Sequence, residues 1–214
     1  MLLTSTAAHQ PSHSSQTQGM NGCESDGIES LVTENATQQS TLEKNAIAFF
    51  QASVGNWQSR RRYYTLSSGE TQEVVSDLTI HFLESDSSAL AELGERHALT
   101  VPMVCGVKVT WESNYLSPAR KPSTGSTIFG IRGDVMYRDR GFATPKPVTA
   151  QYRFIGDSPA ERLRQRTMVL RTEYNGSAFE EELKLIGDSY RTRQTIISRA
   201  GAEIMIGQYL ETRV

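Results

Sequence analysis

The feature of this chain that most restricts its fold is a long series of short segments in which apolar and polar residues alternate. In one of them, Val107, Val109 and Trp111 alternate with a lysine, a threonine and a glutamate. This period of two residues is typical of a β-strand with one buried face. The pattern predicts strands at residues 74–82, 105–112, 127–131, 135–138, 148–155, 164–174, 179–186, 191–197 and 203–210.

Residues that favour tight turns separate many of these segments, as at Gly133-Asp134, Asn175-Gly176 and Gly187-Asp188. Their spacing predicts about nine or ten antiparallel strands with few helical crossovers. We expect a mainly β protein, either an up-and-down barrel or a sandwich, because closing a sheet removes its exposed edges. A barrel of this size can enclose one small ligand.

Two helices are expected beside the strands. Ser40 and Glu43 have the spacing of a capping box, and apolar residues from Ala46 to Phe50 follow at helical spacing before Gly55. This pattern predicts a short N-terminal helix that begins at Ser40. A second helical pattern, with Leu90 and Leu93 on one side, predicts an insertion within residues 86–99.

The chain of 214 residues is long enough for one domain with a proper core. Residues 1–39 are mostly polar and are expected to form a disordered tail, which leaves residues 40–214 as the folded domain. A net charge of −2 gives no electrostatic footprint for nucleic acid. Only Cys23 and Cys105 are cysteines, and no apolar run approaches the roughly 20 residues that span a bilayer. We therefore expect a cytoplasmic protein without a metal site.

The stretch from Phe179 to Arg193 contains charges where a buried strand face is expected. Glu181 falls in the same alternating row as three apolar residues, and Arg191 and Arg193 share one face of the next strand. Two such arginines stand about 7 Å apart, twice the rise per residue of a strand, and are suited to bind an anion. Alternatively, these charges are solvated, as most strand charges are.

The segment FFQASVGNWQSRRRYYTL, residues 49–66, resembles the opening of the S-type phycobiliprotein lyases, the CpcS/CpeS family. Gly55, Trp57, Ser59 and Arg61 stand at the positions of its G-x-W-x-S-x-R motif. The resemblance continues to about residue 213 through VKVTWE, YRDRGF, the Glu180-Glu181 pair, RTR at 191–193 and the closing ETR. For Trp57 an alternative is that it plugs one end of the barrel, with the neighbouring arginines solvated.

This resemblance implies a ten-stranded, lipocalin-like antiparallel barrel that binds a linear tetrapyrrole and transfers it to a cysteine of a phycobiliprotein subunit. The bilin, phycocyanobilin or phycoerythrobilin, would be a substrate rather than a permanent cofactor. Its two propionates suit arginine, its pyrrole N–H groups suit a carboxylate, and its flat conjugated system suits aromatic faces. The expected residues are Arg61, Arg191 and Arg193 for the propionates, Glu181 or Glu211 as the catalytic carboxylate, and Trp111 and Tyr115 as the aromatic faces.

The chemistry expected of such a lyase is addition of the acceptor's thiol to the ring A ethylidene group, which needs no nucleophile from this chain. Cys105 is accordingly expected in the core. The resemblance leaves a homodimer or a heterodimer with a related lyase subunit open. Three alternatives to a self-sufficient lyase are a subunit that is inactive alone, a non-catalytic bilin carrier, and a scaffold protein that has lost the pocket.

Overall fold

The computed structural model describes residues 25–116, 121–156 and 167–214. Contacts within the chain divide it into two units, Met1–Asn35 and Ala36–Val214. In the first unit the described residues, 25–35, are helical. The second unit contains the barrel and all the strands named below.

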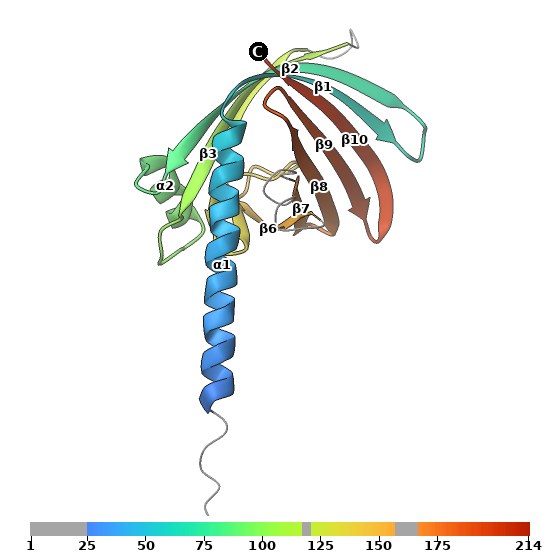
Figure 1. Ribbon diagram of the computed structural model, residues 1–214. Coiled ribbons are helices and arrows are strands. Elements are labelled where there is room, and N and C mark those ends of the chain that lie inside the picture. The colour runs from blue at the N-terminus through green and yellow to red at the C-terminus, as the bar shows by residue number, and fades with distance from the viewer. Residues whose placement is uncertain (1–24, 117–120, 157–166) are drawn as a thin grey trace, which may run out of the picture. The chain divides into compact units, whose positions relative to one another are not determined.

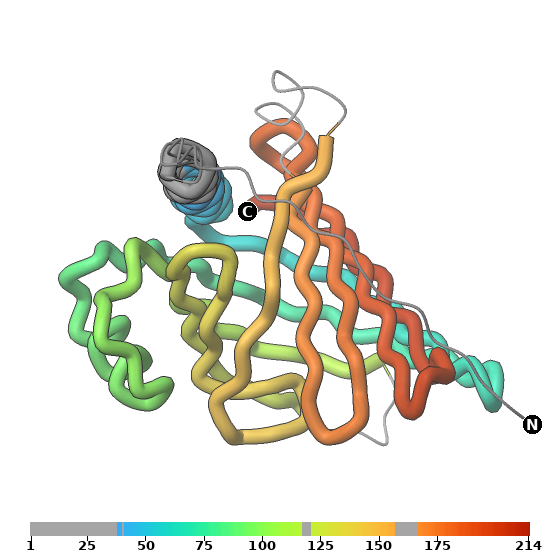
Figure 2. Tube along the Cα trace, turned by 90° about the horizontal axis from the view of Figure 1, so that it is seen from below, coloured from blue at the N-terminus to red at the C-terminus, as the bar shows by residue number. Residues whose placement is uncertain are grey.

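The elements follow one another along the chain as helix α1 (Ser25–Ser53), strands β1 (Gly55–Thr65) and β2 (Thr71–Glu84), helix α2 (Ser88–Arg96), and strands β3 (Cys105–Tyr115), β4 (Ser123–Arg132), β5 (Val135–Arg138), β6 (Val148–Ile155), β7 (Thr167–Tyr174), β8 (Ser177–Ile186), β9 (Tyr190–Arg199) and β10 (Ala202–Arg213) (Figure 1). Each strand pairs antiparallel with the next, and β1 pairs with both β2 and β10, which closes the barrel. Figure 2 shows the strands following one another around this barrel. The prediction of a ten-stranded antiparallel barrel is confirmed.

The tight turns lie where the turn residues predicted them. Gly133, Gly176 and Gly187 adopt positive φ angles of 62°, 71° and 58° at the β4–β5, β7–β8 and β8–β9 connections. Only a residue without a Cβ atom adopts this conformation at little cost, so glycine permits the sharp reversal between neighbouring strands. The predicted strand at residues 164–174 begins at Thr167 in the structure, and residues 157–166 lie outside the described ranges.

Helix α1 packs its last turns against the barrel interior. Ala46, Phe49, Phe50 and Ser53 are buried, at the spacing of one helical face. Trp57, which is fully buried at the start of β1, donates its indole N–H to the Ser53 carbonyl over 2.9 Å. One of the carbonyls left without a partner at the helix end is satisfied in this way.

The predicted helix start at Ser40 is wrong, because α1 begins at Ser25. Helix α1 thus includes residues 25–39, which were expected in the polar tail, while residues 1–24, including Cys23, lie outside the described part of the chain. The Glu43 carboxylate, which a capping box would use at Ser40, accepts the Gly133 N–H at the β4–β5 turn, over 2.7 Å.

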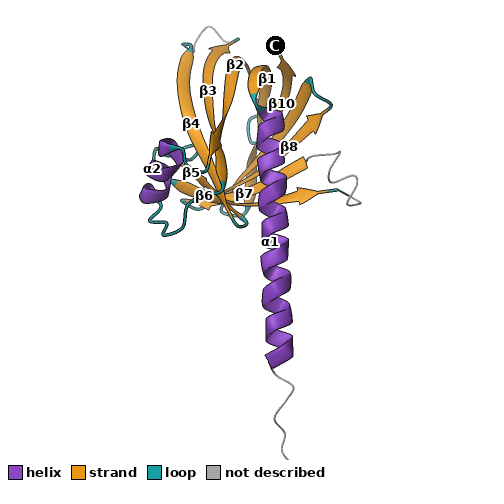
Figure 3. Ribbon diagram, turned by 60° about the vertical axis from the view of Figure 1, so that its left-hand side comes forward, coloured by secondary structure: helices purple, strands orange, loops and turns teal. Residues whose placement is uncertain are grey.

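The second predicted helix is present as α2, within residues 86–99. It buries Leu90 and Leu93 together with Met103, in a small cluster separate from the main core. Gly106 of β3 and Gly130 of β4 lie opposite each other beneath it, and side chains of α2 approach both. Figure 3 shows α2 beside β4 and β5, on the outside of the strands.

Candidate ligand-binding site

The barrel encloses a cavity of about 510 Å³, lined by side chains from α1 and from every strand except β6. All seven site residues predicted from the sequence line it, namely Arg61, Trp111, Tyr115, Glu181, Arg191, Arg193 and Glu211. They come from β1, β3, β8, β9 and β10, and the period of two residues directs their side chains to the inner face. Their chemical roles remain predictions.

One charged group in the cavity wall joins three adjacent strands. Ser59, Glu211 and Arg191 lie opposite one another in the registers of β1, β10 and β9. Arg191 Nε donates to Glu211 Oε2, and the Ser59 hydroxyl donates to Glu211 Oε1 over 3.2 Å. The Arg191 guanidinium also lies 5.1 Å from the ring centre of Trp57. Arg191 and Glu211 therefore form a neutral pair with both side chains buried.

A second charged group is centred on Glu181, whose side chain is 4% exposed. Its carboxylate pairs with Arg193, and its Oε2 lies 3.5 Å from Arg138 Nη1. Burial alone would raise the pKa of Glu181, but the charges of Arg193 and Arg138 outweigh it and hold this pKa below its ordinary value. Glu181 is therefore an ionised carboxylate at neutral pH, which accepts hydrogen bonds and does not donate a proton.

The predicted arginine pair on β9 is present, but neither guanidinium is unoccupied. Arg191 is bonded to Glu211, and Arg193 to Glu181. Arg193 and Arg61 both pack against the ring of Tyr209, at 5.1 and 5.8 Å from its centre. In the described residues, the buried Nε atoms of Arg61 and Arg193 lack a hydrogen-bond partner. The guanidinium groups of Arg61 and Arg193 are therefore better placed than that of Arg191 to receive an anion.

The aromatic part of the cavity comes from several strands. Trp111 and Tyr115 lie on β3, with Trp111 directly opposite Gly125 of β4. On β10 and β1, the Tyr209 hydroxyl donates to the Tyr63 hydroxyl over 3.1 Å. Burial raises the pKa of Tyr209 above its ordinary value, so the phenol stays neutral. The cavity thus combines flat apolar faces with buried charge.

Arginine outnumbers glutamate in this cavity. Among the described residues, five arginines and two glutamates line it and no lysine, aspartate or histidine does, which leaves an excess of three positive charges. Nowhere in the described ranges do three His, Cys, Asp or Glu side chains converge as metal ligands would. The cavity is suited to a flat ligand that carries more than one negative charge.

Sequence reasoning missed several residues of this site, notably Arg138, Arg140, Tyr63 and Tyr209. For Arg138 a signal was present, because it shares the inner face of β5 with buried Met136, just as Glu181 shares an apolar row. Cys105, by contrast, is absent from the cavity wall and is 1% exposed in the core. Burial raises its pKa to about 12, so its thiol is not a nucleophile at neutral pH.

Fold and site together define a closed β-barrel protein with an arginine-rich, aromatic-lined ligand cavity. The family model described as "CpeS-like protein" matches residues 45–214. The chain belongs to this CpeS-like family, which confirms the resemblance seen in the sequence.

Named relatives agree with this assignment. A protein of Nostoc sp. named "Putative phycocyanobilin lyase CpcS 2" is 57% identical over 174 residues, which cover 80% of this chain and 92% of that protein. The "Putative chromophore lyase CpcV" of Picosynechococcus sp. is 49% identical over 177 residues, covering 81% and 84%. The S-type phycobiliprotein lyase structure from Guillardia theta, at 23% identity, has the same fold, with a TM-score of 0.64 over 78% of this chain and 91% of that one.

None of the helices in the described part of the chain combines the length and the apolar character that crossing a bilayer requires.

Proposed function

We propose that this protein is a phycobiliprotein lyase, which binds a linear tetrapyrrole in the barrel cavity and promotes its attachment to a cysteine of a phycobiliprotein subunit. The observation that carries the proposal is the buried, ionised Glu181 in a cavity with an excess of arginine. The relatives at 57% and 49% identity bear lyase names, which favours a lyase over a carrier. We take phycocyanobilin as the substrate to test first, because the first of these names specifies it.

Arginine binds the two propionates of the tetrapyrrole in this proposal. Arg191 and Glu211 neutralise each other, so the positive charge that remains comes from the other arginines. Arg61 and Arg193 are the best placed among the predicted residues, since each has a buried N–H group without a partner in the described part of the chain. A carboxylate that accepts these N–H groups would remove their desolvation cost.

Glu181 accepts hydrogen bonds from the pyrrole N–H groups. Its low pKa means that it carries a negative charge when the ligand arrives. A fixed negative charge beside the conjugated system stabilises a protonated, cationic tetrapyrrole, and this raises the electrophilicity of the ring A ethylidene carbon. Trp111 and Tyr115 offer flat faces for the conjugated system. Glu211, already bonded to Arg191 and Ser59, orients that arginine.

In the covalent step, the sulfur of the acceptor's thiolate bonds to the ethylidene carbon, the carbon–carbon double bond opens, and the adjacent ring carbon takes up a proton. The product is a thioether, and no atom of the lyase enters it. This chain holds the tetrapyrrole in one geometry and shields it from other thiols. Acceptor subunits are therefore required partners, whereas a homodimer or a pairing with a related lyase subunit remains a further proposal.

The test is to incubate the purified protein with phycocyanobilin and an apo-phycobiliprotein subunit, and to detect bilin by zinc-enhanced fluorescence after denaturing electrophoresis. We expect a fluorescent acceptor band that appears faster with the protein than without it. An acceptor whose attachment cysteine is replaced by serine is the matched control and should stay dark. Binding of the bilin without transfer would instead indicate a carrier, or a subunit that needs a partner.

A further inference from the structure

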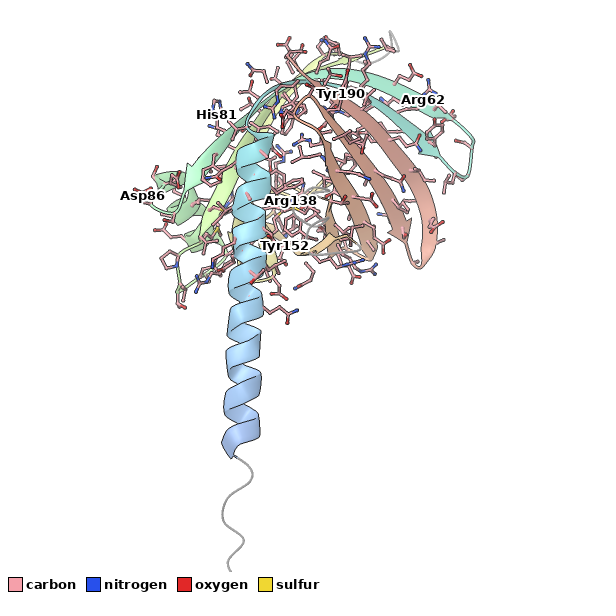
Figure 4. All side chains as sticks on the ribbon, in the orientation of Figure 1. Arg62, His81, Asp86, Arg138, Tyr152 and Tyr190 are labelled. Atoms are coloured by element: carbon pink, nitrogen blue, oxygen red, sulfur yellow. The ribbon has the colours of Figure 1, made fainter. Side chains whose placement is uncertain are left out.

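Arg138 is a buried cation at the cavity wall for which sequence reasoning assigned no role. It ends β5, is 8% exposed, and lines the cavity opposite Phe129 of β4. Its guanidinium lies over the Phe129 ring, 4.8 Å from the centre. Figure 4 shows Arg138 within the ring of strands, whereas Arg62 and Asp86 lie on the outside.

The charge of Arg138 is only partly compensated. Glu181 is its carboxylate partner, at 3.5 Å, and the same carboxylate also pairs with Arg193. The Arg138 Nε is buried and, within the described residues, has no hydrogen-bond partner. One carboxylate thus serves two guanidinium groups, of which that of Arg138 is buried. A buried cation in this position is costly unless a second anion enters the cavity.

The backbone around Arg138 is held from outside the barrel by the segment that contains α2. The His97 Nε2–H donates to the Arg138 carbonyl over 2.9 Å, and the Arg96 guanidinium donates to the Asp139 carbonyl over 2.8 Å. The Asp139 carboxylate accepts the Thr127 hydroxyl and the Ile128 N–H, over 2.6 and 3.1 Å. Both peptide units at the end of β5 are therefore fixed, and this limits where the Arg138 side chain can reach.

We propose that Arg138 binds a carboxylate of the tetrapyrrole, and that His97 is a positioning residue that holds Arg138 for this contact. The proposal rests on the proposed function, since the ligand is the bilin. The proposed role explains why the segment that contains α2 fixes the end of β5 from the outside, at the place where Arg138 has only part of its charge compensated. An arginine that merely balanced Glu181 would not be left with an unpaired N–H group beside a cavity.

The test compares phycocyanobilin with its dimethyl ester, in which both propionates are uncharged, by absorption titration. Wild-type protein should bind the free acid more tightly than the ester. Arg138→Met should weaken binding of the acid roughly tenfold or more, the usual effect of losing a charge-assisted hydrogen bond, and change binding of the ester little. The ratio of the two affinities therefore falls. A purely structural role would weaken both ligands equally and leave the ratio unchanged, which would overturn the proposal.

Two further variants serve as controls for this comparison. Arg171→Met removes an exposed arginine paired with Glu173 and Glu180 on the outside, and should leave both affinities at the wild-type value. Circular dichroism shows whether the methionine variant folds. If it does not, Arg138→Gln, which retains polar atoms, takes its place in the comparison. If wild-type protein binds neither acid nor ester, the proposed function fails as well. If the wild-type protein binds both ligands and the ratio of acid to ester affinity is unchanged in the Arg138 variants, only the role of Arg138 is refuted.

The positioning role is tested by a double-mutant cycle with the same two ligands. His97→Ala should lower the ratio of acid to ester affinity, and should have little further effect once Arg138 is methionine. Such non-additivity is expected when one residue acts through another. A His97→Ala effect of the same size in both backgrounds would show that His97 does not act through Arg138.

Discussion

The indole ring of Trp111 lies against the backbone of Gly125 on the neighbouring strand, so closely that a Cβ atom at Gly125 would stand 2.4 Å from Cζ2 of the indole. This glycine leaves room for a flat aromatic face on the cavity wall. Trp111 and Gly125 therefore act as one unit, and the position of the indole depends on a residue that has no side chain.

Replacing Gly125 with alanine should force the indole into the cavity. We expect weaker phycocyanobilin binding and a changed absorption spectrum of the bound bilin, besides the loss of about 1–3 kcal/mol in folding stability that overpacking usually costs. Gly94→Ala is the matched control, because nothing lies within 4 Å of a Cβ atom there. Absorption titration measures both. Wild-type affinity in Gly125→Ala would mean that the indole does not contact the ligand.

Glu181 links the stability of the protein to pH. Its pKa in the folded protein lies below the ordinary value of about 4.5, so its stabilising contribution is complete above that pH and is lost as the pH falls through the folded pKa. At pH 7, Glu181→Gln should lower the free energy of unfolding by about 3 kcal/mol, because Arg138 and Arg193 lose the carboxylate that they share. Below pH 4.5 the difference from wild type should shrink.

Urea unfolding at pH 7 and at pH 4 tests this prediction. The control is Glu180→Gln, which changes the exposed residue next to Glu181. A Glu181→Gln difference that grows at low pH would contradict the sign of the pKa shift. The same variant should also blunt or blue-shift the absorption of bound bilin, since the negative charge beside the pyrrole N–H groups is gone.

Cys105 should be unreactive in the folded protein, because burial raises its pKa to about 12 and removes access. In a Cys23→Ser variant, Cys105 is the one remaining thiol, and Ellman's reagent at pH 8 should label it slowly until denaturant is added. Stability should fall as the pH rises from the ordinary value of 9 towards 12, since only the unfolded thiol then ionises. Fast labelling in native buffer would place Cys105 on an accessible surface.

Arg213 connects the end of β10 with two other parts of the barrel end. Its guanidinium donates to the carbonyls of Ala52, Val54 and Asp188 and lies 4.3 Å from the ring centre of Trp57. Arg213→Lys cannot reach three carbonyls, so the free energy of unfolding should fall by about 2 kcal/mol. Arg199→Lys, at an exposed position, should have no measurable effect. Equal melting temperatures for the two variants would contradict this role.

The strands could be predicted because the alternation is local, and Glu181 stood out because its row was otherwise apolar. The partners of these charged residues could not be predicted from the sequence. Arg191 meets Glu211 through the register between β9 and β10, and Glu181 meets Arg138 across a separation of 43 residues. Such pairings depend on how the barrel closes, which alternation does not determine. For the same reason, the alternation did not show that Arg191 and Arg193 each pair with a glutamate.

The start of α1 was mispredicted for a different reason. In a capping box the glutamate bonds back to the backbone of the cap residue, whereas the Glu43 carboxylate accepts the N–H of Gly133. That partner is 90 residues away in the chain, so no local pattern contains it.

We propose that the barrel cavity holds a linear tetrapyrrole among its arginines, Glu181 and Trp111. A crystal structure of the protein with phycocyanobilin tests it most directly. We predict the bilin inside the barrel, with pyrrole N–H groups within hydrogen-bond distance of the Glu181 carboxylate and a propionate on Arg61, Arg138 or Arg193. A bilin bound on the outer face, or inside with its pyrrole N–H groups turned away from Glu181, would contradict the account.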